Sequence, residues 1–146
     1  MRVKVTVESI VNPTEDESKV ERALHNIFPS ATIEKTNSPD DRMKLKVQGN
    51  GLEFLATLRN SIKQERIRAA ARSILLSRTS GDRTRFYLNK QVAVVGRVSF
   101  CEPVGESPLG PISIEIESDD PQVVIDYLAA KPGEGAFPRL VERRRR

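Results

Sequence analysis

Three segments of this 146-residue chain alternate strictly between apolar and polar residues. They read "RVKVTVES" (2–9), "RMKLKVQ" (42–48) and "PISIEIE" (111–117). Successive side chains of a β-strand point to opposite faces of its sheet, so each segment buries one face and exposes the other. A sheet made of such strands has one apolar face that a second layer must cover and one polar face that stays in water.

Amphipathic helical segments can supply that second layer. Apolar residues from Val20 to Phe28 recur at helical spacing, and Thr14 with Glu17 has the spacing of a capping box. Within 52–79 the apolar stripe moves to the opposite side, which predicts two helices or a sharp bend near Lys63–Gln64. A last helix is expected after Asp120, which is placed as its N-cap.

Further strands are expected at 31–35, at "RFYL" (85–88) and at "RVSFCE" (97–102). The order of these elements predicts an α+β fold, a two-layer sandwich of a mixed sheet with helices on one face. We expect one domain over residues 1–131, followed by a loop and an arginine-rich C-terminal tail over 132–146.

Bulk composition limits the classes of protein that fit. The longest apolar runs, such as "VAVV" (92–95), are far shorter than the ~20 residues of a membrane span. The N-terminus has no apolar signal core, and Cys101 is the only cysteine, so no internal disulfide can form. These features predict a cytoplasmic protein that contacts no membrane.

Charge is distributed unevenly along the chain. Residues 59–97 hold ten basic and two acidic side chains, whereas residues 98–138 hold one basic and eight acidic. The tail adds the run Arg143 to Arg146. One interpretation is contact with a polyanion on one side of the molecule. The alternative is that the basic segment pairs with the acidic one inside the fold, and the sequence leaves both open.

Enzymatic chemistry has few candidate residues. His25 is expected on the polar side of the first helix, and Cys101 is interpreted as a packing residue. The doublets Asp40–Asp41 and Asp119–Asp120 could bind a divalent ion, although adjacent carboxylates more often form turns and caps. No cofactor is expected, and a metal-dependent nuclease or phosphotransferase is the third-ranked function.

Contact with RNA has better support. Arginine outnumbers lysine 16 to 8, and guanidinium groups suit phosphate oxygens. With no Trp, two Tyr and five Phe, recognition of backbone and shape fits better than a base-stacking platform. Lys90 could hold a phosphate between the amides of Asn89 and Gln91. The alternative for this row is a strand edge whose amides close a turn.

Four segments together resemble a family of archaeal proteins labelled RNA-binding, whose fold is similar to the large-subunit ribosomal protein that contacts 5S rRNA. They are residues 12–29, 64–75, 88–100 and 110–129. The resemblance spans about residues 3–130 and brings no catalytic residues with it. Its most recognisable segment corresponds to Leu88, Asn89, Lys90, Gln91 and Gly96.

We therefore expect a non-enzymatic RNA-binding protein that contacts structured RNA, ribosomal RNA being one possibility. A protein–protein interaction module, such as a homodimer that joins basic to acidic surfaces, is the alternative. The expected RNA contacts are Arg66, Arg68, Arg72, Arg83, Arg85, Asn89, Lys90 and Gln91.

Overall fold

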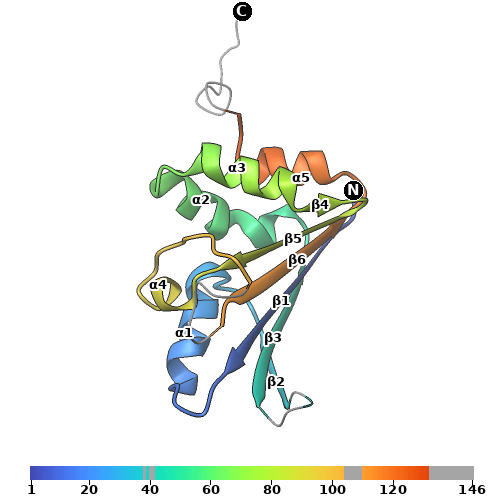
Figure 1. Ribbon diagram of the computed structural model, residues 1–146. Coiled ribbons are helices and arrows are strands. Elements are labelled where there is room, and N and C mark those ends of the chain that lie inside the picture. Colours follow the sequence, from blue (N-terminus) through green and yellow to red (C-terminus); the bar gives the residue numbers. More distant parts are fainter. Residues whose placement is uncertain (38, 40–41, 104–109, 132–146) are drawn as a thin grey trace, which may run out of the picture.

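One six-stranded sheet and a layer of helices form the fold, which the computed structural model describes over residues 1–37, 39, 42–103 and 110–131. The strands lie in the order β2-β3-β1-β6-β5-β4, with the helices gathered on one side (Figure 1). This confirms the predicted two-layer α+β architecture. The elements are β1 (Val3–Val11), α1 (Glu17–Ile27), β2 (Ile33–Asn37), β3 (Met43–Asn50), the 3₁₀-helix η1 (Leu52–Leu55), α2 (Ala56–Gln64), α3 (Arg68–Ser77), β4 (Thr79–Ser80), β5 (Arg83–Leu88), α4 (Lys90–Val94), β6 (Ile112–Ser118) and α5 (Pro121–Leu128).

Every pair of neighbouring strands in the described sheet is antiparallel, so the expectation of a mixed sheet was wrong. The chain passes from β1 through α1 to β2, a connection that often joins parallel neighbours. Here β3 lies between β1 and β2 and pairs antiparallel with both. Strands that run in the same direction are therefore never adjacent.

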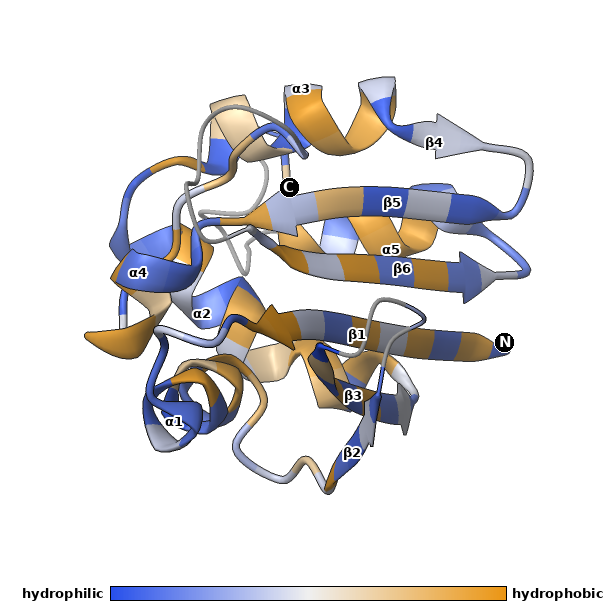
Figure 2. Ribbon diagram, turned by 60° about the horizontal axis from the view of Figure 1, so that its bottom comes forward, coloured by the Kyte–Doolittle hydropathy of each residue, from blue (hydrophilic) through white to orange (hydrophobic). Residues whose placement is uncertain are grey.

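The alternating strands bury one face, as predicted. In β1 the side chains of Val3, Val5 and Val7 are buried, and in β6 those of Ile114 and Ile116 are buried. Figure 2 views the opposite face of the sheet, where no helix covers the strands and α5 lies behind β5 and β6. The polar face is therefore open along the central strands.

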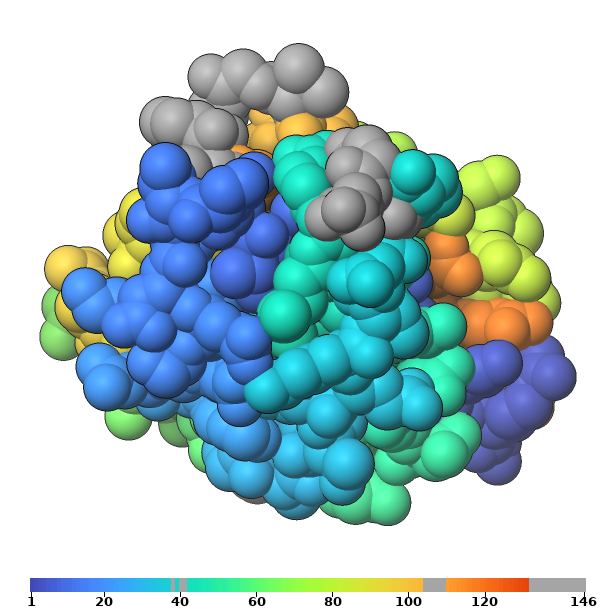
Figure 3. Space-filling model, turned by 90° about the horizontal axis from the view of Figure 1, so that it is seen from below, coloured from blue at the N-terminus to red at the C-terminus, as the bar shows by residue number. Residues whose placement is uncertain are grey.

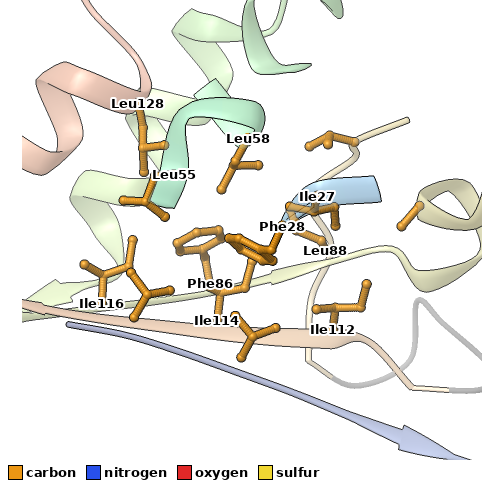
Figure 4. Close-up of a cluster of buried hydrophobic side chains, with 14 of the residues drawn as sticks. Ile27, Phe28, Leu55, Leu58, Phe86, Leu88, Ile112, Ile114, Ile116 and Leu128 are labelled. Carbon is orange, nitrogen blue, oxygen red and sulfur yellow. The ribbon is translucent and has the colours of Figure 1, made fainter. Parts of the chain in front are cut away.

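Apolar side chains of the helical layer and the sheet meet in one core. In Figure 4, Phe28 at the end of α1, Leu58 of α2 and Phe86 of β5 point toward one another, and all three are at most 1% exposed. The predicted change of helical side is confirmed, because α2 ends at Gln64 and α3 begins at Arg68. Each of the two helices can then turn its own apolar stripe inward.

Some local expectations were wrong. Asp16 rather than Thr14 caps α1, because its carboxylate accepts a hydrogen bond from the amide of Ser18 at 2.9 Å. The segment 97–102 is not a strand and makes a single bridge, from Phe100 to Leu88. The short strand β4 was not predicted.

Seen from below, the surface is made mainly of the first third of the chain, which carries α1 and the β2–β3 hairpin (Figure 3). Among the described residues no helix is long and apolar enough to cross a membrane. The predicted tail lies outside the described residues, so the domain boundary at residue 131 stays a prediction.

Two buried serines of the sheet test how strongly the core tolerates unpaired polar groups. The Ser9 hydroxyl, on β1, has no hydrogen-bond partner among the described residues. The Ser118 hydroxyl, on β6, accepts a bond from the Asp120 amide at 3.0 Å. Ser9→Ala should raise the free energy of unfolding by about 1 kcal/mol, whereas Ser118→Ala should lower it by a similar amount. Urea unfolding measures both, and a loss from Ser9→Ala as large as that from Ser118→Ala would contradict the assignment.

Candidate functional site

The row Asn89, Lys90 and Gln91 opens a helix, so the interpretation as a strand edge was wrong. The Asn89 side chain caps α4 by accepting a hydrogen bond from the amide of Val92 at 3.1 Å. At the other end of α4, the amide of Asn26 from α1 donates to the carbonyls of Ala93 and Val94 at 2.8 and 3.1 Å. Asn89 therefore serves the fold, while Gln91 is exposed on α4.

Lys90 is buried, with only 2% of its side chain exposed. Its Nζ donates to the carbonyl of Ile10 at 2.7 Å and to the two carboxylate oxygens of Glu15 at 2.8 and 3.1 Å. The ammonium thus joins the end of β1, the loop before α1 and the start of α4. The fold therefore occupies the cation that was expected to hold a phosphate, and a phosphate could reach it only by displacing these partners.

Glu15 is the carboxylate partner of Lys90, and its pKa is lowered by the pairing. Burial by itself would raise the pKa of Glu15, but hydrogen bonds from Lys90 and from the backbone and side chain of Asn12 outweigh it and hold the pKa below the ordinary value of 4.5. A carboxylate with a lowered pKa stabilises the fold above its unfolded-state pKa, about 4.3. That contribution is lost as the pH falls through the lower pKa of the folded state.

Most cations of the basic segment meet carboxylates. Arg72, which is 8% exposed, places Nη1 2.7 Å from Asp126 Oδ1 and also bonds the carbonyl of Ala129. This buried guanidinium was expected to contact RNA, and the fold instead engages it with Asp126 and Ala129. Three further pairs join Arg78 to Glu102, Arg85 to Glu115 and Arg97 to Glu65.

Arg83 and Arg85 lie on the open face of the sheet beside β6. Their side chains are 55% and 61% exposed, and both bond the carboxylate of Glu115. The hydrogen bonds that Arg85 donates to the Glu115 carboxylate raise the pKa of Arg85 above its ordinary value. For this part of the basic segment, the alternative of pairing within the fold is the one that the structure supports.

Four cations differ from these, and we call them the cationic cluster. Arg59 and Lys63 lie on α2, Arg66 lies in the turn after it, and Arg68 begins α3. None has a carboxylate within ion-pair distance in the part of the chain that the structure describes. Arg59 instead stacks over the ring of Tyr127 on α5, with its guanidinium carbon 4.9 Å from the ring centroid.

A cavity of about 340 Å³ adjoins this cluster. Arg59 and Lys63 line it from α2, Arg68 from α3, and Asp126 and Tyr127 from α5. Its one carboxylate, Asp126, is already engaged by Arg72. On the side of α2 and α3 the cavity is therefore lined by three cations that no carboxylate of the described residues pairs.

Arg66 occupies a backbone conformation that favours glycine, with φ of 60°. Its amide bonds the carbonyl of Lys63 at 3.1 Å, and the amide of Ile67 bonds the carbonyl of Ile62 at 3.2 Å. These two bonds form a Schellman motif at the end of α2, in which the left-handed position is usually glycine. An arginine at this position is strained, and its side chain is exposed.

Of the expected RNA contacts, only Arg66 and Arg68 belong to the cationic cluster. Arg83 and Arg85 lie on the open sheet face, and Asn89 and Lys90 are occupied around α4. Sequence reasoning missed Arg59 and Lys63. A signal existed, because between Glu53 and Asp82 the only acidic residue is Glu65, which Arg97 engages.

Candidate metal ligands are scattered. Asp40 and Asp41 lie outside the described residues, and Asp119 accepts a hydrogen bond from the backbone of Arg2 at 2.9 Å. Among the described residues no three His, Cys, Asp or Glu side chains gather. His25 is exposed, as expected, and its Nε2 lies 3.1 Å from the carbonyl oxygen of Ala31.

Comparison with known proteins gives consistent matches along most of the chain. A family model described as RNA binding matches residues 4–118. The UPF0201 protein of Sulfolobus acidocaldarius is 39% identical over 132 residues, 90% of each chain. That of Pyrobaculum aerophilum is 41% identical over 136 residues, which are 92% of this chain and 93% of the relative.

A solved structure agrees as well. The crystal structure of a UPF0201 protein from Methanococcus jannaschii superposes with a TM-score of 0.77 at 30% identity, covering 86% of this chain and 98% of that one. The resemblance inferred from the sequence to an archaeal family labelled RNA-binding is confirmed. The expected likeness to the ribosomal protein that contacts 5S rRNA stays a prediction.

The buried pair can be tested against an exposed one. Lys90→Met should lower the free energy of unfolding at pH 7 by about 3–5 kcal/mol, because it leaves the Glu15 carboxylate without its cation. Arg97→Met is the matched control, since the Arg97 side chain is 70% exposed in its pair with Glu65. Its loss should be much the smaller of the two, because solvent screens an exposed ion pair. Urea unfolding measures both, and equal losses would contradict a special role for Lys90.

Acidification gives an independent readout of the same pair. The unfolding free energy of the natural chain should decline below about pH 4.3, as carboxylates with lowered pKa values, Glu15 among them, become protonated. In Lys90→Met, Glu15 loses the hydrogen bond that most lowers its pKa, so the decline should be shallower. A double variant, Glu15→Gln with Lys90→Met, should recover much of the stability at pH 7 and show the same shallower decline.

Proposed function

The chain belongs to the UPF0201 family, and we propose that it is an RNA-binding protein whose cationic cluster holds the phosphates of the RNA. The observation that carries the proposal is the charge of Arg59, Lys63, Arg66 and Arg68, which no carboxylate among the described residues pairs. Phosphate contacts supply most of the sequence-independent affinity for nucleic acid. Guanidinium forks can engage phosphate oxygens with two bonds, while lysine acts as a point charge.

The proposal is narrower than the set of contacts expected from the sequence. Arg72 and Lys90 are left out because they are buried against Asp126 and Glu15. Arg83 and Arg85 are left out because an RNA phosphate would compete with Glu115 for them. A contact by Gln91 stays a prediction, as do the arginine tail's contribution, the homodimer alternative and the nuclease alternative.

Strain at Arg66 supports the same surface. Backbone strain that a fold retains often marks a functional position. Glycine would relieve it without changing the two hydrogen bonds of the turn, since both run between backbone atoms. An arginine here adds an exposed cation between Lys63 and Arg68, and we infer that RNA contact is the reason for it.

Salt dependence separates the cationic cluster from the paired arginines. Each phosphate contact contributes a slope of roughly −0.7 on single strands and −0.9 on duplex DNA to a plot of log affinity against log salt. A Lys63→Gln, Arg68→Gln double variant should therefore flatten the slope by about 1.5 and weaken binding. Filter binding of a structured RNA across several salt concentrations measures it.

The matched control is Arg83→Gln with Arg85→Gln, which removes two cations of the same segment that already bond Glu115. Its slope should stay close to that of the natural chain. If this control flattens the slope and the cluster variant does not, the surface is misplaced. If the natural chain shows no salt-dependent binding to any structured RNA, the proposed function itself is wrong.

Arg66→Gly should separate stability from binding. Relief of the left-handed strain should raise the free energy of unfolding by about 0.5–1 kcal/mol, after allowance for the greater chain entropy of glycine. The same variant should bind RNA more weakly. Arg66→Ala is the control, because it removes the charge but keeps the strain, so it should weaken binding without gaining stability. Equal binding by all three chains would exclude Arg66 from the interface.

A further inference from the structure

The cavity beside the cationic cluster is large enough for more than a phosphate. It lies where α2, the start of α3 and the end of α5 meet, helices that lie together at the end of the molecule where the chain leaves α5 (Figure 1). Its volume of about 340 Å³ falls within the range of sites that hold small ligands, roughly 300–1,000 Å³. A single nucleotide fits that range, whereas a bare phosphate would leave most of the space unfilled.

The positive charge of the lining suits a ligand that carries more than one negative charge. Arg59, Lys63 and Arg68 line the cavity without a carboxylate partner among the described residues, and Asp126 is neutralised by Arg72. A cleft with charge of one sign concentrates its field on an anion inside it. An internal phosphodiester brings one negative charge, while a phosphate monoester carries about −1.5 to −2 at pH 7.

We therefore propose that this cavity binds the phosphorylated end of an RNA strand, a terminal nucleotide that carries a phosphate monoester. The inference rests on the proposed RNA-binding function and names the part of the RNA that the site selects. Internal phosphates of the same strand then lie along the remainder of the cationic cluster, where Arg66 is exposed in the turn between α2 and α3.

Two cations around the cavity are held in place before any ligand arrives. Arg59 is stacked on the ring of Tyr127 at 4.9 Å, which limits the rotamers that it can adopt. Arg72 donates to Asp126 and to the carbonyl of Ala129 at 3.0 Å, so α3 is fixed against the end of α5. Preorganisation of this kind lowers the entropy lost on binding.

The α5 side of the cavity suits the sugar and base. Ala130 and the aromatic ring of Tyr127 belong to the lining, while Leu128 adjoins it and is only 2% exposed. This side offers apolar contact, in contrast to the cations from α2 and α3. A nucleotide can therefore lie with its phosphate toward Lys63 and Arg68 and its ribose and base toward the end of α5.

Short RNAs that differ only at one end test the proposal. Fluorescence anisotropy would compare single strands with a 5′-phosphate, a 5′-hydroxyl or a 5′-methylphosphate, each labelled at the 3′ end. A second set would carry a 3′-phosphate or a 3′-hydroxyl with the label at the 5′ end. One of the two monoester ends should bind on the order of tenfold tighter than its controls, the factor that one charge-assisted hydrogen bond gives. The methylphosphate, with one charge, should bind more weakly than the monoester.

Variants connect that preference to the cavity. Arg59→Gln or Lys63→Gln should remove the difference between the monoester and hydroxyl ends. Arg22→Gln is the matched control, because Arg22 is an exposed arginine on α1 and does not line the cavity. It should leave the preference intact, and circular dichroism would verify that each variant is folded.

The outcomes separate this inference from the proposed function. If all ends bind alike while the Lys63 and Arg68 variants still weaken binding, the cavity does not select a terminal phosphate and RNA binding stands. If Arg59→Gln keeps the full preference, the cavity is the wrong location. If no RNA binds the natural chain, both proposals are overturned.

Discussion

Burial of only one face of the sheet determines where charge can accumulate in this molecule. The alternating strands place their basic and acidic side chains on the same open face, and the register sets Arg85 opposite Glu115 and Arg83 opposite Glu117. Directly opposite side chains on antiparallel strands are close enough to pair. The open face therefore neutralises most of its own cations. Surplus positive charge is left to the helical layer, where α2 and α3 carry no acidic residue.

A buried ammonium has a different role from an exposed one. Taking Lys90 out of water costs several kcal/mol, about as much as its bonds to Glu15 and the Ile10 carbonyl return. Those bonds nevertheless define one position for α4, a helix of only 5 residues that could not persist alone. The Asn89 cap and the bonds from Asn26 act on the same helix. The segment 88–96 therefore attaches α4 to β1 and α1.

Sequence reasoning succeeded where the signal was periodic and failed where it depended on distant partners. Alternation predicted the one-sided sheet, and the shifted stripe predicted the break between α2 and α3. The "VAVV" run is rich in β-branched residues, so its helical state depends on Asn89, Lys90 and Asn26, which come from two parts of the chain. Charge counts along the sequence likewise could not show that Arg85 is paired while Arg68, among the described residues, is not. Only the strand register shows which arginine lies opposite a glutamate.

Lys90, Ser9 and Arg66 are each in an unfavourable local environment. They differ in which interactions offset the cost. Lys90 is a buried charge whose partners are all supplied by the fold. Ser9 is a buried hydroxyl without a hydrogen-bond partner in the described part of the chain, a small cost that a large core can absorb. Arg66 holds a strained backbone, yet its side chain is exposed and engages no carboxylate among the described residues. The two capping hydrogen bonds of the turn hold that strain, and glycine would make the same bonds without it. What arginine adds at this position is an exposed cation between Lys63 and Arg68, which agrees with the proposed contact to an anion.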